Sequence, residues 1–165
     1  MIPLPRDFRE FIQLLNEHRV RYLVIGGYAV GYHGYPRYTG DLDVFVELSS
    51  KNIQAVAKVL RQFGLLAKDA THEPLLKRGT IVRMGREPMR LEVINDIDGV
   101  TFAECYKHRV MARTKNLHIN FIDLAHLRRN KQASGRAKDL EDLRRLPETT
   151  KRKRPKPRTK KDSFQ

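Results

Sequence analysis

The stretch that decides the fold is YLVIGGYAVGYHGYPRYTGDLDVFVE, residues 22–47. It begins with an apolar run at residues 23–25, which is typical of a buried strand and stops at Gly26 and Gly27. Two glycines let the backbone turn sharply there and leave N–H groups open to a ligand. The helix predicted next, at about residues 28–33, directs its N-terminus at the same point, which suits an anion such as phosphate.

A second strand is predicted from Asp41 onward. Successive strand side chains point to opposite faces, so Asp41 and Asp43 share one face while Leu42 and Val44 share the other. Two neighbouring carboxylates repel each other unless a cation lies between them, and hard oxygen ligands favour Mg²⁺. A phosphate cradle beside an acid pair indicates a nucleoside triphosphate site.

A third carboxylate is expected on a later strand. Residues 80–84 and 89–95 read as two strands joined by a turn, and Glu92 lies on the second, which can pair beside Asp41 and Asp43. Asp96 and Asp98 are the alternatives, although they fall in a loop where Asp is an ordinary turn former.

The rest of the chain alternates helical and strand patterns. Helices are predicted at residues 7–19, 50–63 and 101–106 and again between 123 and 146, with a further hairpin at 109–122. We therefore expect one α+β domain over residues 1–148, a mixed sheet flanked by helices and closed by a C-terminal helix.

These motifs resemble a known family. Gly26-Gly27, a spacer and Asp41-x-Asp43 on a strand look like the signature of the DNA polymerase beta-type nucleotidyltransferase superfamily. The longer string adds Arg37 and Thr39, and it is similar to small prokaryotic nucleotidyltransferases related to toxin–antitoxin and abortive-infection enzymes. The resemblance implies the nucleotidyltransferase fold over most of the chain.

The resemblance also implies a reaction, in which a nucleoside monophosphate passes from a nucleoside triphosphate, ATP among the candidates, to a hydroxyl group and pyrophosphate leaves. Two Mg²⁺ ions, or Mn²⁺, would be held by Asp41 and Asp43, with Glu92 completing the catalytic set. The residues expected to bind the nucleotide are Gly26, Gly27, Arg37, Thr39 and Lys131.

Lys131 has an alternative reading as part of a solvated basic helix face. That reading is favoured for Lys138, which the resemblance also brings near the triphosphate. Asp139 and Asp142 are expected to form ion pairs on the helix surface rather than bind metal.

The charge of the chain points to a polyanionic partner. The net charge is +14, and residues 151–165 alone carry eight Lys or Arg residues against one Asp. We expect residues 149–165 to be a disordered basic tail that binds nucleic acid, RNA in preference, through Lys151, Arg152, Lys153 and Arg154. The alternative is a tail that only aids solubility.

Several classes are disfavoured by what the sequence lacks. No apolar run is long enough for a membrane helix, no signal-peptide pattern opens the chain, and there is no P-loop motif. The single Cys105 is expected to be a small, semi-buried hydrophobe rather than a catalytic thiol. These features predict a cytoplasmic protein that does not bind membranes.

The leading prediction is a nucleotidyltransferase with a tRNA-like acceptor, and an antitoxin is a candidate partner. The alternatives are the same chemistry on a protein or small-molecule hydroxyl, and a non-catalytic nucleic-acid-binding module with the same fold.

Overall fold

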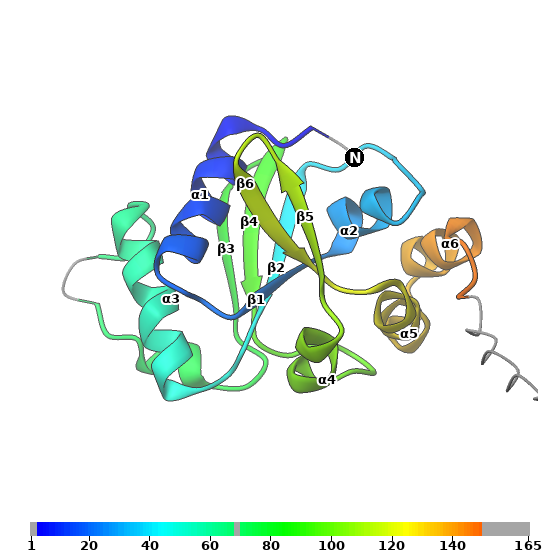
Figure 1. Cartoon of the computed structure of the whole chain (residues 1–165). Coiled ribbons are helices and arrows are strands. Elements are labelled where there is room, and N and C mark those ends of the chain that lie inside the picture. Colours follow the sequence, from blue (N-terminus) through cyan, green and yellow to red (C-terminus); the bar gives the residue numbers. More distant parts are fainter. Residues whose placement is uncertain (1–2, 68–69, 150–165) are drawn as a thin grey trace, which may run out of the picture.

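A computed structural model describes residues 3–67 and 70–149 of the chain (Figure 1). The segment that contains Lys151, Arg152, Lys153 and Arg154 lies outside the described residues, so its proposed contact with nucleic acid stays a prediction.

The described residues form helices and strands in close to the predicted order. The helices are α1 (Arg6–Glu17), α2 (Gly26–Tyr32), α3 (Ser50–Gln62), the 3₁₀-helix η1 (Glu73–Leu76), α4 (Phe102–Lys107), α5 (Leu124–Ser134) and α6 (Ala137–Arg145). The strands are β1 (Tyr22–Ile25), β2 (Asp41–Val46), β3 (Ile81–Arg86), β4 (Met89–Ile94), β5 (Val110–Thr114) and β6 (Leu117–Phe121).

The strands make one mixed sheet in the order β3-β4-β2-β1-β6-β5. β2 runs antiparallel to β1 and parallel to β4, and β1 runs parallel to β6, while β3–β4 and β5–β6 are antiparallel hairpins. The strand that carries the acid pair therefore lies inside the sheet, next to the strand that carries Glu92.

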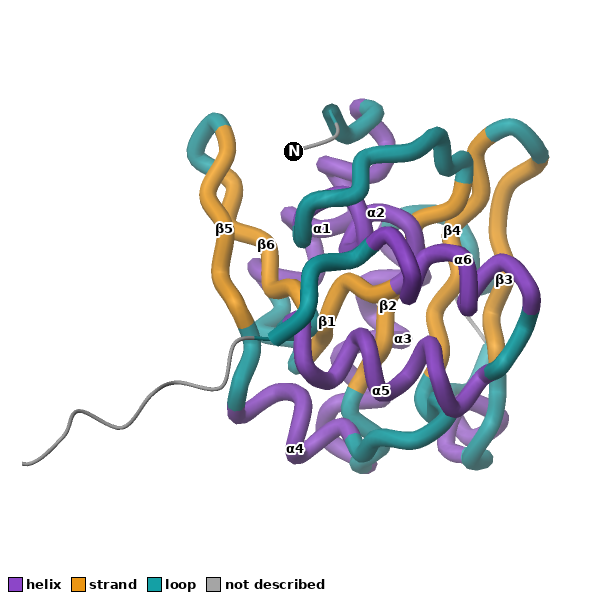
Figure 2. The backbone as a smooth tube through the Cα atoms, turned by 90° about the vertical axis from the view of Figure 1, so that its right-hand side faces the viewer, coloured by secondary structure: helices purple, strands orange, loops and turns teal. Residues whose placement is uncertain are grey.

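Helices cover both faces of the sheet (Figure 1). On one face lie α1 and α3, and α1 buries Phe8, Phe11, Ile12 and Leu15, which the 3.6-residue period of a helix gathers into one stripe. On the other face lie α2, α5 and α6, and Figure 2 shows α5 and α6 in front of the central strands. The catalytic candidates face this second layer.

The start of α2 differs from the prediction. The helix begins at Gly26, directly after β1, with no intervening turn. Gly26 has a φ of +65°, a left-handed conformation that turns the chain from extended strand into helix within one residue. The glycine pair is thus the first turn of the helix rather than a separate loop.

Two smaller features concern the classes excluded above. Cys105 lies in the hydrophobic core and is fully buried, deeper than the semi-buried position predicted, and burial raises the pKa of its thiol to about 12. Within residues 3–67 and 70–149, none of the helices has both the length and the apolar character required to span a membrane.

Candidate nucleotide-binding site

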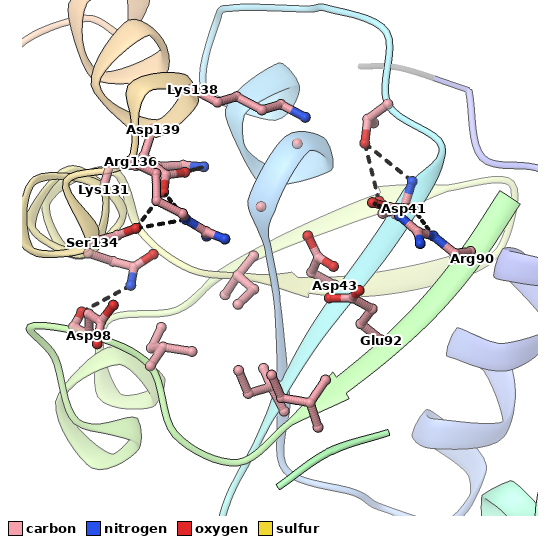
Figure 3. Close-up of a pocket in the computed structure, with 18 of the residues that line it drawn as sticks. Asp41, Asp43, Arg90, Glu92, Asp98, Lys131, Ser134, Arg136, Lys138 and Asp139 are labelled. Atoms are coloured by element: carbon pink, nitrogen blue, oxygen red, sulfur yellow. Dashed lines mark hydrogen bonds and ion pairs between the residues drawn. The ribbon is translucent and has the colours of Figure 1, made fainter. Parts of the chain in front are cut away.

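The register of the parallel β2–β4 pair brings the predicted acids together. Asp43 lies opposite Glu92, and Asp41 lies opposite Arg90. All four line a cavity of about 720 Å³ between the sheet and the α5–α6 layer (Figure 3). The expectation that Glu92 is carried on a strand beside the acid pair is confirmed. Asp96 and Asp98 line the same cavity, but Asp98 lies next to α5, away from Asp43 and Glu92.

Asp43 is the carboxylate whose charge is least well accommodated. Burial, followed by the negative charges of Glu92 and Asp41, raises its pKa from 3.8 to about 7. The positive charge of Lys131 acts in the opposite direction but is the smallest of these influences. A carboxylate in this position is stabilised by binding either a proton or a cation.

Each of the other two acids has an arginine partner. Arg90 Nε donates to Asp41 Oδ1 at 3.2 Å, and Arg83 Nε donates to Glu92 Oε1 at 2.9 Å. Reasoning from the sequence did not find these pairs. A signal was nevertheless present, because Arg90 and Glu92 alternate on one strand face in register with Asp41 and Asp43.

The residue types of the donor set suit a divalent cation, although their side chains do not enclose one point as they stand. Three carboxylates on adjacent strands supply hard oxygen ligands, and the raised pKa of Asp43 shows that their charges are not fully compensated. In the described ranges no group of three or more His, Cys, Asp or Glu side chains is gathered closely enough to hold an ion. To bind an ion, the carboxylate of Asp41 would have to give up its hydrogen bond from Arg90.

The glycine pair allows α2 to approach these acids closely. A Cβ atom at Gly26 would collide with the carboxylate of Asp43, and one at Gly27 would collide with the side chain of Thr39. Thr39 Oγ1 in turn bonds to the backbone of Asp41, donating to its carbonyl at 3.3 Å. Gly26, Gly27 and Thr39 all line the cavity, so the structure brings these predicted residues to the acids.

Lys131 lies deeper than a solvated helix face would place it. Its Nζ lies 2.9 Å from Asp139 Oδ1 and 3.1 Å from Asp142 Oδ2, and all three side chains are buried. Arg37 donates to both carboxylate oxygens of Asp142, at 2.7 and 2.8 Å. We call Arg37, Lys131, Asp139 and Asp142 the buried ion cluster.

The buried ion cluster corrects the expectation for two of its acids. Asp139 and Asp142 are not surface residues, because α6 packs against α5 and turns both carboxylates inward onto Lys131. Burial alone would raise the pKa of Asp139, but hydrogen bonds from Ser134, Lys131 and Arg136 outweigh it and lower the pKa to about 2. The pKa of Asp142 is lowered for the same kind of reason, by Arg37 and Lys131.

The position of Arg37 also refines its predicted role. Arg37 lines the cavity, but its Nε and Nη2 groups donate to the two carboxylate oxygens of Asp142. These two donors are therefore not free to bind a ligand. Lys138 is exposed, as expected for a solvated face, and it also lines the cavity, as does Arg136. Figure 3 shows both extending from the α5–α6 side toward the acids.

Comparisons with known proteins identify the fold. No family model matches the chain, and no curated protein matches it at a significant level. Among solved structures, it resembles a candidate nucleotidyltransferase from Thermotoga maritima, with a TM-score of 0.59 and 16% identity over 84% of this chain and 89% of that one. The α+β nucleotidyltransferase-like fold is therefore confirmed, while the toxin and abortive-infection subgroup stays a prediction.

Proposed function

We propose that the protein is a Mg²⁺-dependent nucleotidyltransferase that transfers a nucleoside monophosphate from a nucleoside triphosphate to a hydroxyl group. The observation that carries the proposal is the cavity in which Asp41, Asp43 and Glu92 meet the Gly26–Gly27 turn. The likeness in fold to a candidate nucleotidyltransferase supports it.

The acids would hold the metal ions. Asp41 and Asp43 are the ligands proposed for both ions, and Glu92 would complete the site nearest the acceptor hydroxyl and receive its proton. Bound there, the ions would activate the attacking hydroxyl and stabilise the leaving oxygen of an in-line displacement.

The remaining wall of the cavity would hold the triphosphate. The backbone N–H groups at Gly26 and Gly27 are proposed to contact phosphate oxygens, because the cavity reaches both residues. Arg136 and Lys138 add positive charge on the α5–α6 side. Arg37 and Lys131 would act through the buried ion cluster, which holds that side of the cavity in place, and Lys131 would also contribute positive charge near Asp43.

The proposed acceptor is RNA. The chain carries a net charge of +14, which exceeds what one triphosphate requires and favours a polyanionic acceptor such as a tRNA-like 3′ end. The segment with Lys151, Arg152, Lys153 and Arg154 is proposed to contribute to this binding.

The test is incubation with each α-labelled nucleoside triphosphate, Mg²⁺ and total RNA, followed by separation of labelled RNA, labelled protein and free nucleotide. We expect label in a tRNA-sized band. Asp41→Asn and Glu92→Gln are expected to lower incorporation by at least about 100-fold, because each removes a proposed metal ligand. Asp96→Asn is the matched control, since Asp96 lines the same cavity but pairs with Arg78 in the loop after β4, and it should retain activity.

Two results would contradict the proposal. If Asp96→Asn abolished incorporation and Glu92→Gln did not, the third acid would be assigned wrongly. If the wild-type protein labelled no RNA and no protein with any nucleotide, transfer itself would be rejected.

A second candidate function is a nucleic-acid-binding module that does not catalyse transfer. The pairs Arg90–Asp41 and Arg83–Glu92 favour it, because guanidinium groups already compensate two of the three acids. RNA binding without label incorporation, and without any effect of Mg²⁺ on affinity, would support this second function.

A further inference from the structure

Two groups of cations face each other across the acids of the cavity. On the α5–α6 side lie Arg136 and Lys138, and on the β3–β4 side lie Arg83 and Arg90. Figure 3 shows Asp43 and Glu92 between Arg136 and Lys138 on one side and Arg90 on the other. The cavity therefore offers two separate places for negatively charged groups, with the proposed reaction centre between them.

The two sides differ in how enclosed they are. A cavity of about 720 Å³ is of the size that holds one small ligand, so it can take a nucleotide but not a polymer as well. β3 is the edge strand of the sheet, and the side chain of Arg83 is 64% exposed. A long acceptor can reach the acids along this edge without entering the enclosed part.

The register places Arg83 and Arg90 so that they can act together. Arg83 lies opposite Glu92, and Gly85 lies opposite Arg90, so the two arginines are diagonal neighbours across the β3–β4 ladder. Diagonal neighbours are about 7–8 Å apart, within reach of long side chains that bind adjacent phosphates of one strand. Gly85 has no side chain that could cover Arg90.

We propose that Arg83 and Arg90 form the subsite that binds the phosphodiester backbone of the acceptor polynucleotide beside the acids. This inference rests on the proposed transfer to a nucleic acid. Guanidinium groups suit phosphate oxygens because they donate two hydrogen bonds in a fixed fork. Glu92 and Asp41, the partners of Arg83 and Arg90, are proposed metal ligands, so an ion bound there would free both guanidinium groups from these acids. Arg90 would keep only its 3.6 Å contact with the exposed Glu87.

The structure supplies a matched control on the same hairpin. Arg86 is exposed and lies on the same strand as Arg83, but three positions further along, so its side chain projects from the opposite face. It does not line the cavity. Arg86→Gln removes the same charge from the same strand without touching the proposed subsite.

The experiment measures binding of a fluorescent single-stranded RNA of about 12 nucleotides, a length within the usual span of such sites, to the full chain with Mg²⁺ at several salt concentrations. We expect the double variant Arg83→Gln/Arg90→Gln to bind roughly tenfold more weakly at low salt and to lower the slope of log K against log salt by about 1.4, since each phosphate left without its cation removes about 0.7. Arg86→Gln should keep the wild-type slope. The double variant Arg83→Lys/Arg90→Lys keeps the positive charge and should therefore keep most of the wild-type salt slope.

A fluorescent nucleoside triphosphate serves as the second probe. With Mg²⁺ present, its affinity should fall much less in Arg83→Gln/Arg90→Gln than in Arg136→Gln/Lys138→Gln. Thermal unfolding shows whether the glutamine double variant folds. If it does not, the single variant Arg83→Gln is tested in its place, because the side chain of Arg83 is largely exposed and its loss should not unfold the protein.

Three outcomes overturn the inference. They are a wild-type salt slope in the double glutamine variant, an equal loss in Arg86→Gln, and a loss of triphosphate affinity in place of RNA affinity. A DNA strand of the same sequence shows whether the subsite requires RNA or accepts any phosphodiester backbone, and either result supports a backbone subsite. Failure of the proposed function is recognised in a different assay. In that case the wild-type protein transfers no labelled nucleotide, whatever RNA affinity the variants show.

Discussion

At Asp43 the fold holds a carboxylate that is opposed by burial, by Glu92 and by Asp41 at once, which raises its pKa from 3.8 to about 7. Because the folded-state pKa lies above the unfolded one, the folded protein binds the proton more tightly. The stability that this provides is fully present below about pH 4 and is lost as the pH rises through 7.

We therefore predict that Asp43→Asn is more stable than the wild type at pH 8 and not at pH 4. A difference in the free energy of unfolding on the order of 1–3 kcal/mol is expected at pH 8, since one pKa unit corresponds to about 1.4 kcal/mol. Urea unfolding at both pH values in the presence of a chelator measures it. An equal difference at both pH values would contradict the cause given for the pKa shift.

Gly26 is the second residue with a consequence of its own. We predict that Gly26→Ala lowers the free energy of unfolding by about 1–2 kcal/mol, because its φ of +65° disfavours any side chain, and abolishes transfer, because the new Cβ displaces Asp43. Gly64→Ala is the matched control, with a φ of +81° and open space around it. It should show the stability loss alone, as measured by thermal unfolding and label incorporation, and a Gly26→Ala variant with full activity would contradict the assignment.

At the scale of elements, the buried ion cluster joins α5, α6 and the loop before β2. Asp142 accepts from Arg37 and lies 3.1 Å from Lys131, so its carboxylate bridges the half-buried Arg37 and the buried Lys131. Removing one partner of a buried pair leaves the other charges uncompensated.

We predict that Asp142→Ala lowers the free energy of unfolding by about 3 kcal/mol and raises the KM for the nucleoside triphosphate, because the α5–α6 side of the cavity loosens. Glu141→Ala is the control on the same helix. Glu141 pairs with Arg144 and Arg145 at the surface, so its loss should cost at most about 0.5 kcal/mol. Denaturant unfolding and steady-state kinetics measure both variants, and equal effects would show that the cluster has no special role.

Much of this arrangement was predictable because it depends on local patterns. The alternation of Asp41 and Asp43, the apolar residues 23–25 and the stripe of α1 each follow from a period of 2 or 3.6 residues. The position of Glu92 was predictable as a strand residue, and the parallel pairing of β2 with β4 confirmed its place beside Asp43.

The parts that were missed depend on contacts between distant segments. Asp142 and Arg37 are 105 residues apart, and no spacing rule relates them, so the acids of α6 were expected at the surface. Arg90 meets Asp41 only because β2 and β4 pair in one particular register. The start of α2 at Gly26 was missed because glycines more often mark a turn than a first helical residue.

At the scale of the whole molecule, positive charge exceeds what the described site uses. Residues 151–165 hold eight cationic side chains and one Asp, which is half of the net charge of +14. These residues lie outside the described part of the chain, and their effect can be measured by removing them.

We predict that deletion of residues 151–165 weakens RNA binding and flattens its salt dependence, because fewer counterions are released, by a slope of about 0.7 for each phosphate that is no longer neutralised. Replacing the segment with Gly and Ser of equal length is the control for chain length and should behave like the deletion. Binding measured from low to physiological salt tests this, and an unchanged slope would remove the segment from the proposed interface.

The proposed site draws its parts from positions spread along the sequence, from Gly26 and Asp43 through Glu92 to Lys138. During synthesis on the ribosome, the acids of β2 emerge long before β4 can pair with them, and α6 emerges last. A growing chain would therefore gain no activity until almost all of the domain has left the exit tunnel.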